Sequence, residues 1–125
     1  MKSQKIKLNS VLIGVRDIKK SVKFYESVFG VTFSEIRPPF SCFTFGGIEF
    51  NVEEISPERS ENWEEKYIGT AKSIAFEVED MDSFLKNVEQ AGGKIIVPPR
   101  NRPWGWQDAE FSDIDGNIFI VERKL

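Results

Sequence analysis

Apolar residues follow two spacings in the first part of the chain, one typical of a strand and one typical of a helix. Between residues 10 and 15 they sit at strand spacing, and over Ile18–Phe29 they recur at the period of a helix with one apolar face. Asp17 is placed to cap this helix and Gly30 to end it. The pattern therefore predicts a strand followed by a helix.

Three short strands are predicted after this helix, at 32–36, 40–45 and 48–53. Gly46 and Gly47 lie between the last two and predict a tight hairpin turn. The predicted order of the first half is therefore βαβββ.

The second half repeats this order. Asp80 is placed to cap a second helix containing Met81, Leu85 and Val88, and the pair Gly92-Gly93 to end it. Strands are predicted at 73–78, 94–97, 108–112 and 118–123.

Shifting the chain by 63 positions superposes identical residues at the start of each first strand, at each helix cap and at each helix end. The pairs are Ser10 with Ser73, Asp17 with Asp80, and Gly30 with Gly93. Such a match predicts duplication of a βαβββ unit. We therefore expect one α+β domain over residues 1–125, made of two modules (9–56 and 73–124) with pseudo-twofold symmetry and joined by an acidic linker, 54–72.

Composition narrows the possible chemistry. The 125 residues suit one domain, and they include no histidine and a single cysteine, Cys42. Catalysis by histidine, zinc sites with histidine ligands and intrachain disulfides are thereby excluded, and the cysteine usage suits the cytoplasm. A net charge of −3 argues against nucleic-acid binding. Arg16 interrupts the one early apolar run, so neither a signal peptide nor a membrane span is predicted.

Two segments resemble signatures of the vicinal oxygen chelate superfamily, which includes glyoxalases, extradiol dioxygenases and bleomycin-resistance proteins. The first is Val-x-Asp-x-x-x-Ser-x-x-Phe-Tyr-x-x-x-Phe-Gly over residues 15–30, and the second is Asp-Ile-Asp-Gly-Asn over 113–117. Arg-Pro-Trp-Gly at 102–105 looks most like the bleomycin-resistance branch. The resemblance implies paired βαβββ modules of the glyoxalase/bleomycin-resistance type, assembled as a homodimer.

The resemblance also locates the positions that hold a divalent metal in the family's enzymes. In this chain they are Ser10, Asn51, Ser73 and Ile120. Hydroxyl, amide and alkyl groups do not replace a shell of imidazoles and carboxylates. A shift of two residues would bring in Glu49 or Glu53 and Glu122, but would leave both serines. The resemblance therefore implies that this chain uses no metal and no other cofactor.

Alternation along the strands predicts two contrasting sheet faces. The face turned to the helices receives Val11, Ile13, Val15, Ile48, Phe50, Val52, Ile74, Phe76, Val78, Phe119 and Val121. The opposite face receives smaller or polar residues and is the expected ligand cleft: Ser10, Leu12, Gly14, Glu49, Asn51, Glu53, Ser73, Ala75, Glu77 and Ile120.

Aromatic residues supply candidate walls for this cleft. Trp104 and Trp106 are the main candidates, and packing over a sheet edge is an equal alternative for Trp104. Phe43 and Phe45 are further candidates, with core packing the preferred alternative. The expected ligand contacts are Ser10, Leu12, Glu49, Asn51, Ser73, Trp104, Trp106 and Ile120. Trp63 and Tyr67 in the linker form either a lid or an anchor.

Three functions are compatible with this pattern. The preferred one is metal-free binding or sequestration of a flat or cationic small molecule by a cytoplasmic homodimer. The alternative is a glyoxalase-like lyase or a dioxygenase-related enzyme, which without metal would need a buried Glu49 or Glu53 as its base. The third is an interaction module without a small ligand, which a filled concave face would support.

Overall fold

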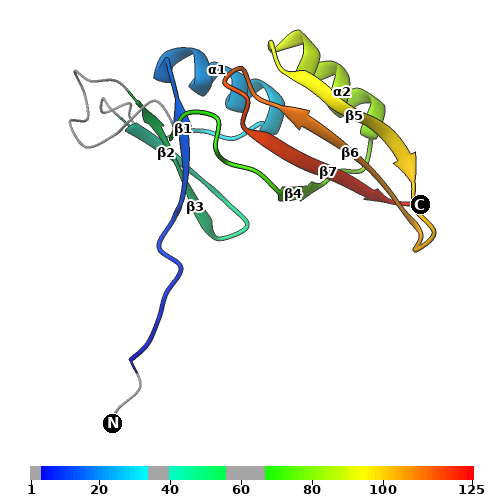
Figure 1. Ribbon diagram of the computed structural model, residues 1–125, viewed down its shortest axis with the longest axis horizontal. Coiled ribbons are helices and arrows are strands. Elements are labelled where there is room, and N and C mark those ends of the chain that lie inside the picture. Colours follow the sequence, from blue (N-terminus) through cyan, green and yellow to red (C-terminus); the bar gives the residue numbers. More distant parts are fainter. Residues whose placement is uncertain (1–3, 34–39, 56–66) are drawn as a thin grey trace.

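The computed structural model describes residues 4–33, 40–55 and 67–125. Their elements are β1 (Val11–Val15), α1 (Ile18–Phe29), β2 (Phe40–Phe45), β3 (Ile48–Glu54), β4 (Ile74–Glu77), α2 (Met81–Gln90), β5 (Lys94–Asn101), β6 (Trp106–Ser112) and β7 (Ile118–Lys124). Figure 1 shows α1 and α2 on the same side of the two sheets, and no helix of the described residues lies on the other side.

The two sheets have matching topologies. In the first, the strand order is β1-β3-β2, with β1 parallel and β2 antiparallel to β3. In the second, the order is β4-β7-β6-β5, with β4 parallel and β6 antiparallel to β7. The fold is therefore α+β and made of two modules, as predicted.

The described residues of the first module contain three of its four predicted strands. Of the expected strand 32–36, Thr32 and Phe33 belong to no strand, and the other three residues lie outside the described part of the chain. In the second module the equivalent strand is β5, which extends to Asn101 instead of ending at Val97. Its pairing with β6 shifts on either side of Val97. Proline has no N–H to give to a ladder, so Pro98 and Pro99 are tolerated because β5 lies at the sheet edge.

Local signals at the helix ends and the hairpin are confirmed. Asp17 accepts hydrogen bonds from the backbone N–H groups of Lys19 and Lys20, and Asp80 accepts one from that of Ser83. Gly30 ends α1 in the left-handed conformation, with φ of 65°. The Gly46-Gly47 turn joins β2 to β3, and both of its residues have positive φ.

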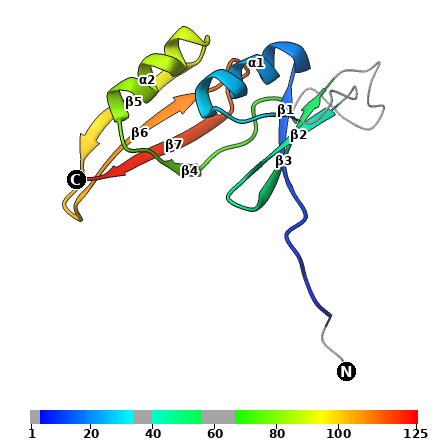
Figure 2. The ribbon, with the colours of Figure 1, turned by 180° about the vertical axis from the view of Figure 1, so that it is seen from behind.

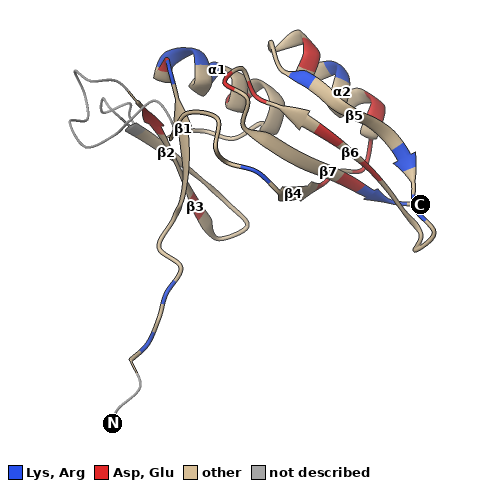
Figure 3. Ribbon diagram, in the orientation of Figure 1, with Lys and Arg blue, Asp and Glu red and all other residues tan. Residues whose placement is uncertain are grey.

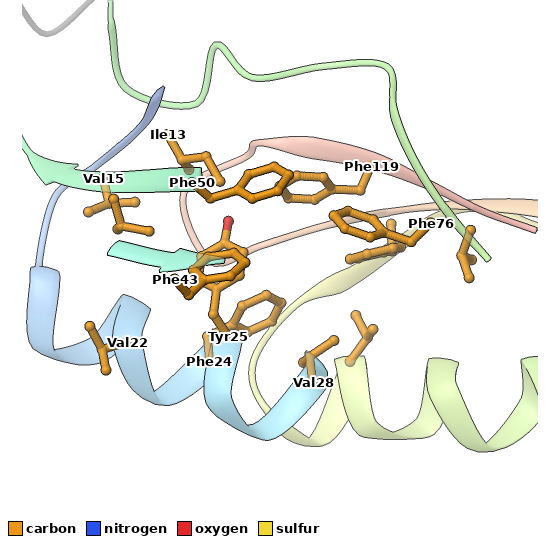
Figure 4. Packing of buried hydrophobic residues seen from close by; sticks show 14 of the residues in the cluster. Ile13, Val15, Val22, Phe24, Tyr25, Val28, Phe43, Phe50, Phe76 and Phe119 are labelled. Carbon is orange, nitrogen blue, oxygen red and sulfur yellow. The ribbon is translucent and has the colours of Figure 1, made fainter. Parts of the chain in front are cut away.

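One hydrophobic core lies between the helices and both sheets. Most of the predicted helix-facing residues are buried in it or packed against it. Figure 4 shows side chains from both sheets, including Phe43 and Phe119, around Tyr25 of α1. Ile48 shares the side of β3 that Phe50 and Val52 occupy, but it begins the strand beside the hairpin turn, is 39% exposed and lies outside the core cluster.

Candidate functional site

The open face of the first sheet brings three of the predicted ligand residues together. Leu12 of β1 lies opposite Asn51 of β3, which in turn lies opposite Cys42 of β2. The Nδ2 atom of Asn51 donates a hydrogen bond to the Oγ atom of Ser10 over 3.2 Å. Ser10, Leu12 and Asn51 are all half-buried. Together they form a small patch of two polar side chains and one apolar side chain that solvent can reach.

The two ends of this patch differ. At one end Glu49 is exposed and lies opposite Thr44. At the other end the backbone of Tyr67 lies against Gly14, so closely that a Cβ atom on Gly14 would collide with the Tyr67 carbonyl oxygen. The face was expected to be open at Gly14, but the returning linker fills it there.

Of the other two predicted strand residues, only Ile120 lies on the open face of the second sheet. Ile120 of β7 lies between Ala75 of β4 and Glu110 of β6. Ser73 precedes β4, is exposed, and has a φ of 67°, a left-handed backbone that serine rarely adopts. Neither Ser73 nor Ile120 shares a hydrogen bond with Ser10 or Asn51 in the described part of the chain.

A pair of arginines on one carboxylate lies beyond Ile120 on this face, and the sequence analysis missed it. The Nε atoms of Arg100 and Arg102 each donate to Asp108 over 2.9 Å, and Arg100 also lies 3.7 Å from Glu110. Burial opposes the charge of Asp108, but the two arginine bonds outweigh it and lower its pKa. Arg100 and Arg102 are two residues apart, as are Asp108 and Glu110, so each pair was expected to lie on one side of its strand. Predicting that the two pairs meet required the β5–β6 register.

Trp104 and Trp106 lie away from the patch on the first sheet. Trp104 sits in the loop between β5 and β6, is 65% exposed, and has the Arg102 guanidinium 5.4 Å from its ring centre. Trp106 begins β6 opposite Lys124. Figures 1 and 2 show this loop near the C-terminus at one end of the molecule, with β1 and β3 toward the other end. One chain therefore does not bring the tryptophans to Ser10 and Asn51.

The two phenylalanine candidates differ in burial. Phe43 is buried, and its ring stacks on Phe50 at 5.1 Å and on Tyr25 at 5.8 Å. Its preferred assignment to the core is therefore correct, and it is no wall of the open face. Phe45 is 39% exposed and makes edge contacts with Phe76 and Phe29.

The Asp-Ile-Asp-Gly-Asn segment forms a turn that joins the modules. Asp113 is buried and accepts hydrogen bonds from the Tyr25 hydroxyl over 2.6 Å and from Asn117 Nδ2 over 2.7 Å. Asn117 also donates to the carbonyl of Gly14 and accepts from the N–H of Ala71. Burial, reinforced by the Asp113 charge, raises the pKa of Tyr25 well above its usual range. This network is structural, because it fixes β1 against the second module.

Asp115, in the same turn, contacts the first module at its surface. It accepts from the backbone N–H of Arg16 over 3.2 Å, and its side chain lies 3.6 Å from the Arg16 guanidinium. Partial burial raises the pKa of Asp115, opposed by the hydrogen bond from Arg16.

Two pockets lie outside the predicted ligand face. One of about 340 Å³ opens at the start of α2, between Asp80 and Arg123, and one of about 290 Å³ lies between α1 and the 113–117 turn, with Lys20 and Lys23 at its rim. Neither is lined by a residue predicted to bind the ligand.

The side chains at the positions that the resemblance assigns to the family's metal do not fit a divalent metal. The Ser10 hydroxyl already accepts a hydrogen bond from the Asn51 amide, and the Ile120 side chain has no atom that can coordinate a metal. Over the described ranges, no three His, Cys, Asp or Glu side chains lie close enough together to hold a metal ion. The metal-free base hypothesis also loses support, because Glu49 is exposed and Glu53 is only half-buried.

No helix in the described part of the chain is long and apolar enough to cross a membrane.

Comparison with known proteins identifies the family. The model of the Glyoxalase/Bleomycin resistance protein/Dioxygenase superfamily matches residues 7–121. The protein YraH of Bacillus subtilis, described as uncharacterized, is 30% identical over 96% of this chain and 100% of its own length.

Solved structures agree in fold. A glyoxalase-related enzyme from Fulvimarina pelagi has a TM-score of 0.77 at 17% identity, covering 94% of this chain and 88% of its own. The fosfomycin resistance protein FosX from Mesorhizobium loti has a TM-score of 0.69 at 23% identity, covering 98% and 95%. With its paired modules, its open sheet faces and a match over nearly its whole length, this chain belongs to the Glyoxalase/Bleomycin resistance protein/Dioxygenase superfamily.

Proposed function

We propose that this protein binds and sequesters a small molecule in the cleft of its open sheet faces without a metal ion. The observation that carries the proposal is the side-chain set at the family's metal positions. Ser10 and Asn51 are hydrogen-bonded to each other, and Ile120 offers only an alkyl surface. Such groups can contact an organic ligand, but they make a poor metal shell.

A flat or cationic ligand fits the residues around the cleft best. Glu49 supplies an exposed carboxylate, and Trp104 supplies a ring that is 65% exposed. Both favour a planar cation through charge and stacking.

Because the β5–β6 loop and β1 lie toward opposite ends of one chain, the proposal includes a homodimer. The loop of one copy would then complete the cleft of the other. We place this dimer in the cytoplasm, where the single Cys42 would remain reduced.

The test is calorimetric titration of cationic aromatic compounds, beginning with bleomycin, into protein treated with a chelator. Asn51→Leu removes the amide on the patch, and Trp104→Ala removes the ring. Each is expected to weaken binding about tenfold or more, the loss of about 1.4 kcal/mol. Glu89→Gln, on the exposed face of α2, is the matched control and should bind as the unmodified chain does.

Two results would contradict the proposal. If both variants bind with unchanged affinity, the ligand lies elsewhere. If chelation abolishes binding and zinc, nickel or iron restores it, the site uses a metal and the enzymatic alternative gains support.

A further inference from the structure

A groove lies on the helix side of the molecule, where the first module meets the second. One pocket of about 290 Å³ lies between α1 and the 113–117 turn, and another of about 170 Å³ lies between α1 and the end of α2. Ser27 of α1 and Ala91, at the end of α2, line both pockets, which are here called together the helix groove. Because α1 and α2 cover one side of the sheets, the helix groove lies on the opposite side from the open faces (Figure 1).

The floor of the helix groove is apolar. Phe24 is 2% exposed, Ala91 is half-buried, and Ile114 of the turn between β6 and β7 is 38% exposed. Phe24 belongs to the first module, whereas Ala91 and Ile114 belong to the second. An apolar surface that is still in contact with water gains free energy when a ligand covers it. The helix groove therefore suits a ligand with a small apolar body that contacts both modules.

Two lysines form one rim of the helix groove. Lys20 and Lys23 are exposed and three residues apart on α1, so their Cβ atoms lie about 5–6 Å apart on one side of the helix. Neither lysine forms an ion pair within the described part of the chain. Figure 3 shows the basic residues of α1 in blue. Two neighbouring like charges repel, so an anion between the two ammonium groups is favourable.

The nearest carboxylates in the sequence do not neutralise this rim. Asp17 caps α1 by accepting hydrogen bonds from two backbone N–H groups. Asp115 accepts hydrogen bonds from the backbone N–H of Arg16 and from the Ser21 hydroxyl. Glu26 is exposed and does not line the groove. Over the described ranges, the charged side chains that line the helix groove are therefore all basic.

The other end of the helix groove is polar and uncharged. It is lined by the hydroxyl of Ser27 and by the exposed amides of Asn87 and Gln90. The charge thus lies at one end and the apolar floor beside it. This order matches a ligand with a single anionic group on an apolar body.

We propose that the helix groove binds a small organic acid. The carboxylate lies between Lys20 and Lys23, and the apolar body covers Phe24 and Ile114. This site is separate from the open sheet faces and selects the opposite charge from the ligand proposed there. Because its walls come from different modules, a bound acid also stabilises the packing of the modules.

The test is titration of isotope-labelled protein with phenylacetate, followed by NMR of the backbone amides. We expect saturable shifts at Lys23, Ser27, Ala91 and Ile114, with a dissociation constant of about 1 mM because the groove is small and open. Phenethylamine has a similar apolar body and the opposite charge, and acetate has the carboxylate without that body. Each is expected to bind at least about fivefold more weakly than phenylacetate.

Two variants separate the parts of the site. Lys20→Gln/Lys23→Gln should weaken phenylacetate binding about fivefold or more, because two partly solvated charge contacts are lost. Ile114→Asn keeps both lysines and should weaken binding about threefold, because it removes apolar contact. Lys5→Gln/Lys7→Gln is the matched control, since it removes the same charge from exposed positions outside the groove and should bind as the unmodified chain does.

Four results would overturn the inference. The site is wrong if the shifts appear at Asn51 and its neighbours instead of the groove, or if no saturable shift appears up to about 10 mM phenylacetate. Selection of an organic acid is wrong if phenethylamine or acetate binds as tightly, or if Lys20→Gln/Lys23→Gln changes nothing. If the groove amides shift with protein concentration alone, a second copy occupies the groove. Calorimetric titration of cationic aromatic compounds decides the open-face proposal separately.

Discussion

At the scale of single residues, the Tyr25 hydroxyl shows how one polar atom links the modules. Periodicity assigns Tyr25 to the apolar face of α1, and its ring is buried there. Its hydroxyl nevertheless donates to Asp113 of the second module over 2.6 Å. A buried carboxylate requires such donors, so Tyr25 contributes both packing and a hydrogen bond.

We expect Tyr25→Phe to lower the free energy of unfolding at pH 7 by about 1–3 kcal/mol, because Asp113 loses a donor. The raised pKa adds a dependence on pH. The stability that Tyr25 contributes is complete below the unfolded pKa of about 10 and falls as the pH rises through the folded value. Urea unfolding of both proteins from pH 7 to 10.5 measures this.

Above about pH 10, the free energy of unfolding of Tyr25→Phe should fall less than that of the unmodified chain. If the two free energies run parallel across this pH range, ionisation of Tyr25 does not contribute to the pH dependence of stability. A double-mutant cycle with Asp113→Asn isolates the pair and should give a coupling of about 1 kcal/mol or more.

At the scale of elements, the internal repeat places Gly30 and Gly93 at equivalent positions for different physical reasons. Gly30 has a left-handed backbone, and a Cβ atom added there would have open space around it. At Gly93 an added Cβ would collide with the Ser112 carbonyl oxygen and lie 2.7 Å from Val88 and 2.9 Å from Phe24. Glycine suits position 30 because of the backbone conformation there, and it suits position 93 because neighbouring atoms leave no room for a side chain.

Asparagine substitutions at the two positions distinguish the effect of backbone conformation from the effect of packing. Gly30→Asn should cost less than about 1 kcal/mol, because asparagine tolerates the left-handed conformation and its side chain has room. Gly93→Asn should cost about 3 kcal/mol, because backbone and ring atoms occupy the space. Urea denaturation provides both values, and similar losses in the two variants would contradict the distinction.

At the scale of the whole molecule, the two modules share one core. Phe29 of the first module lies with its ring 4.7 Å from Phe76 and 5.9 Å from Phe84, and it also reaches Phe111 and Phe119. The hydrogen bond from the Asn117 side-chain amide to the Gly14 carbonyl crosses the same boundary. The described part of the chain is therefore expected to unfold as one cooperative unit.

Phe29→Ala tests this cooperativity. We expect a loss of about 3 kcal/mol, because the side chain is partly buried among six other rings. A single calorimetric transition should remain, and tryptophan fluorescence should report the same midpoint. Lys86→Ala, on the exposed face of α2, is the control. Two separate transitions would contradict a shared core.

Much of the fold was predictable because its signals are local. Apolar spacing located both helices, and Asp17 and Asp80 cap them as predicted. The Gly46-Gly47 turn and the apolar helix-facing layer were also predictable from short-range pattern. Ile48 and the end of β5 were not, because they depend on how far a helix or a neighbouring strand reaches.

By itself, the sequence determined the α+β fold of two modules, because that fold follows from residue type and spacing. Its resemblance to the family implied that serine, asparagine and isoleucine occupy the positions of the family's metal ligands. Only the tertiary structure decided that Tyr67 closes the face at Gly14, that Arg100 and Arg102 meet on Asp108, and that β1 and the β5–β6 loop lie toward opposite ends of the chain. These contacts join residues from different elements, and their geometry depends on register and module packing, which no local pattern encodes.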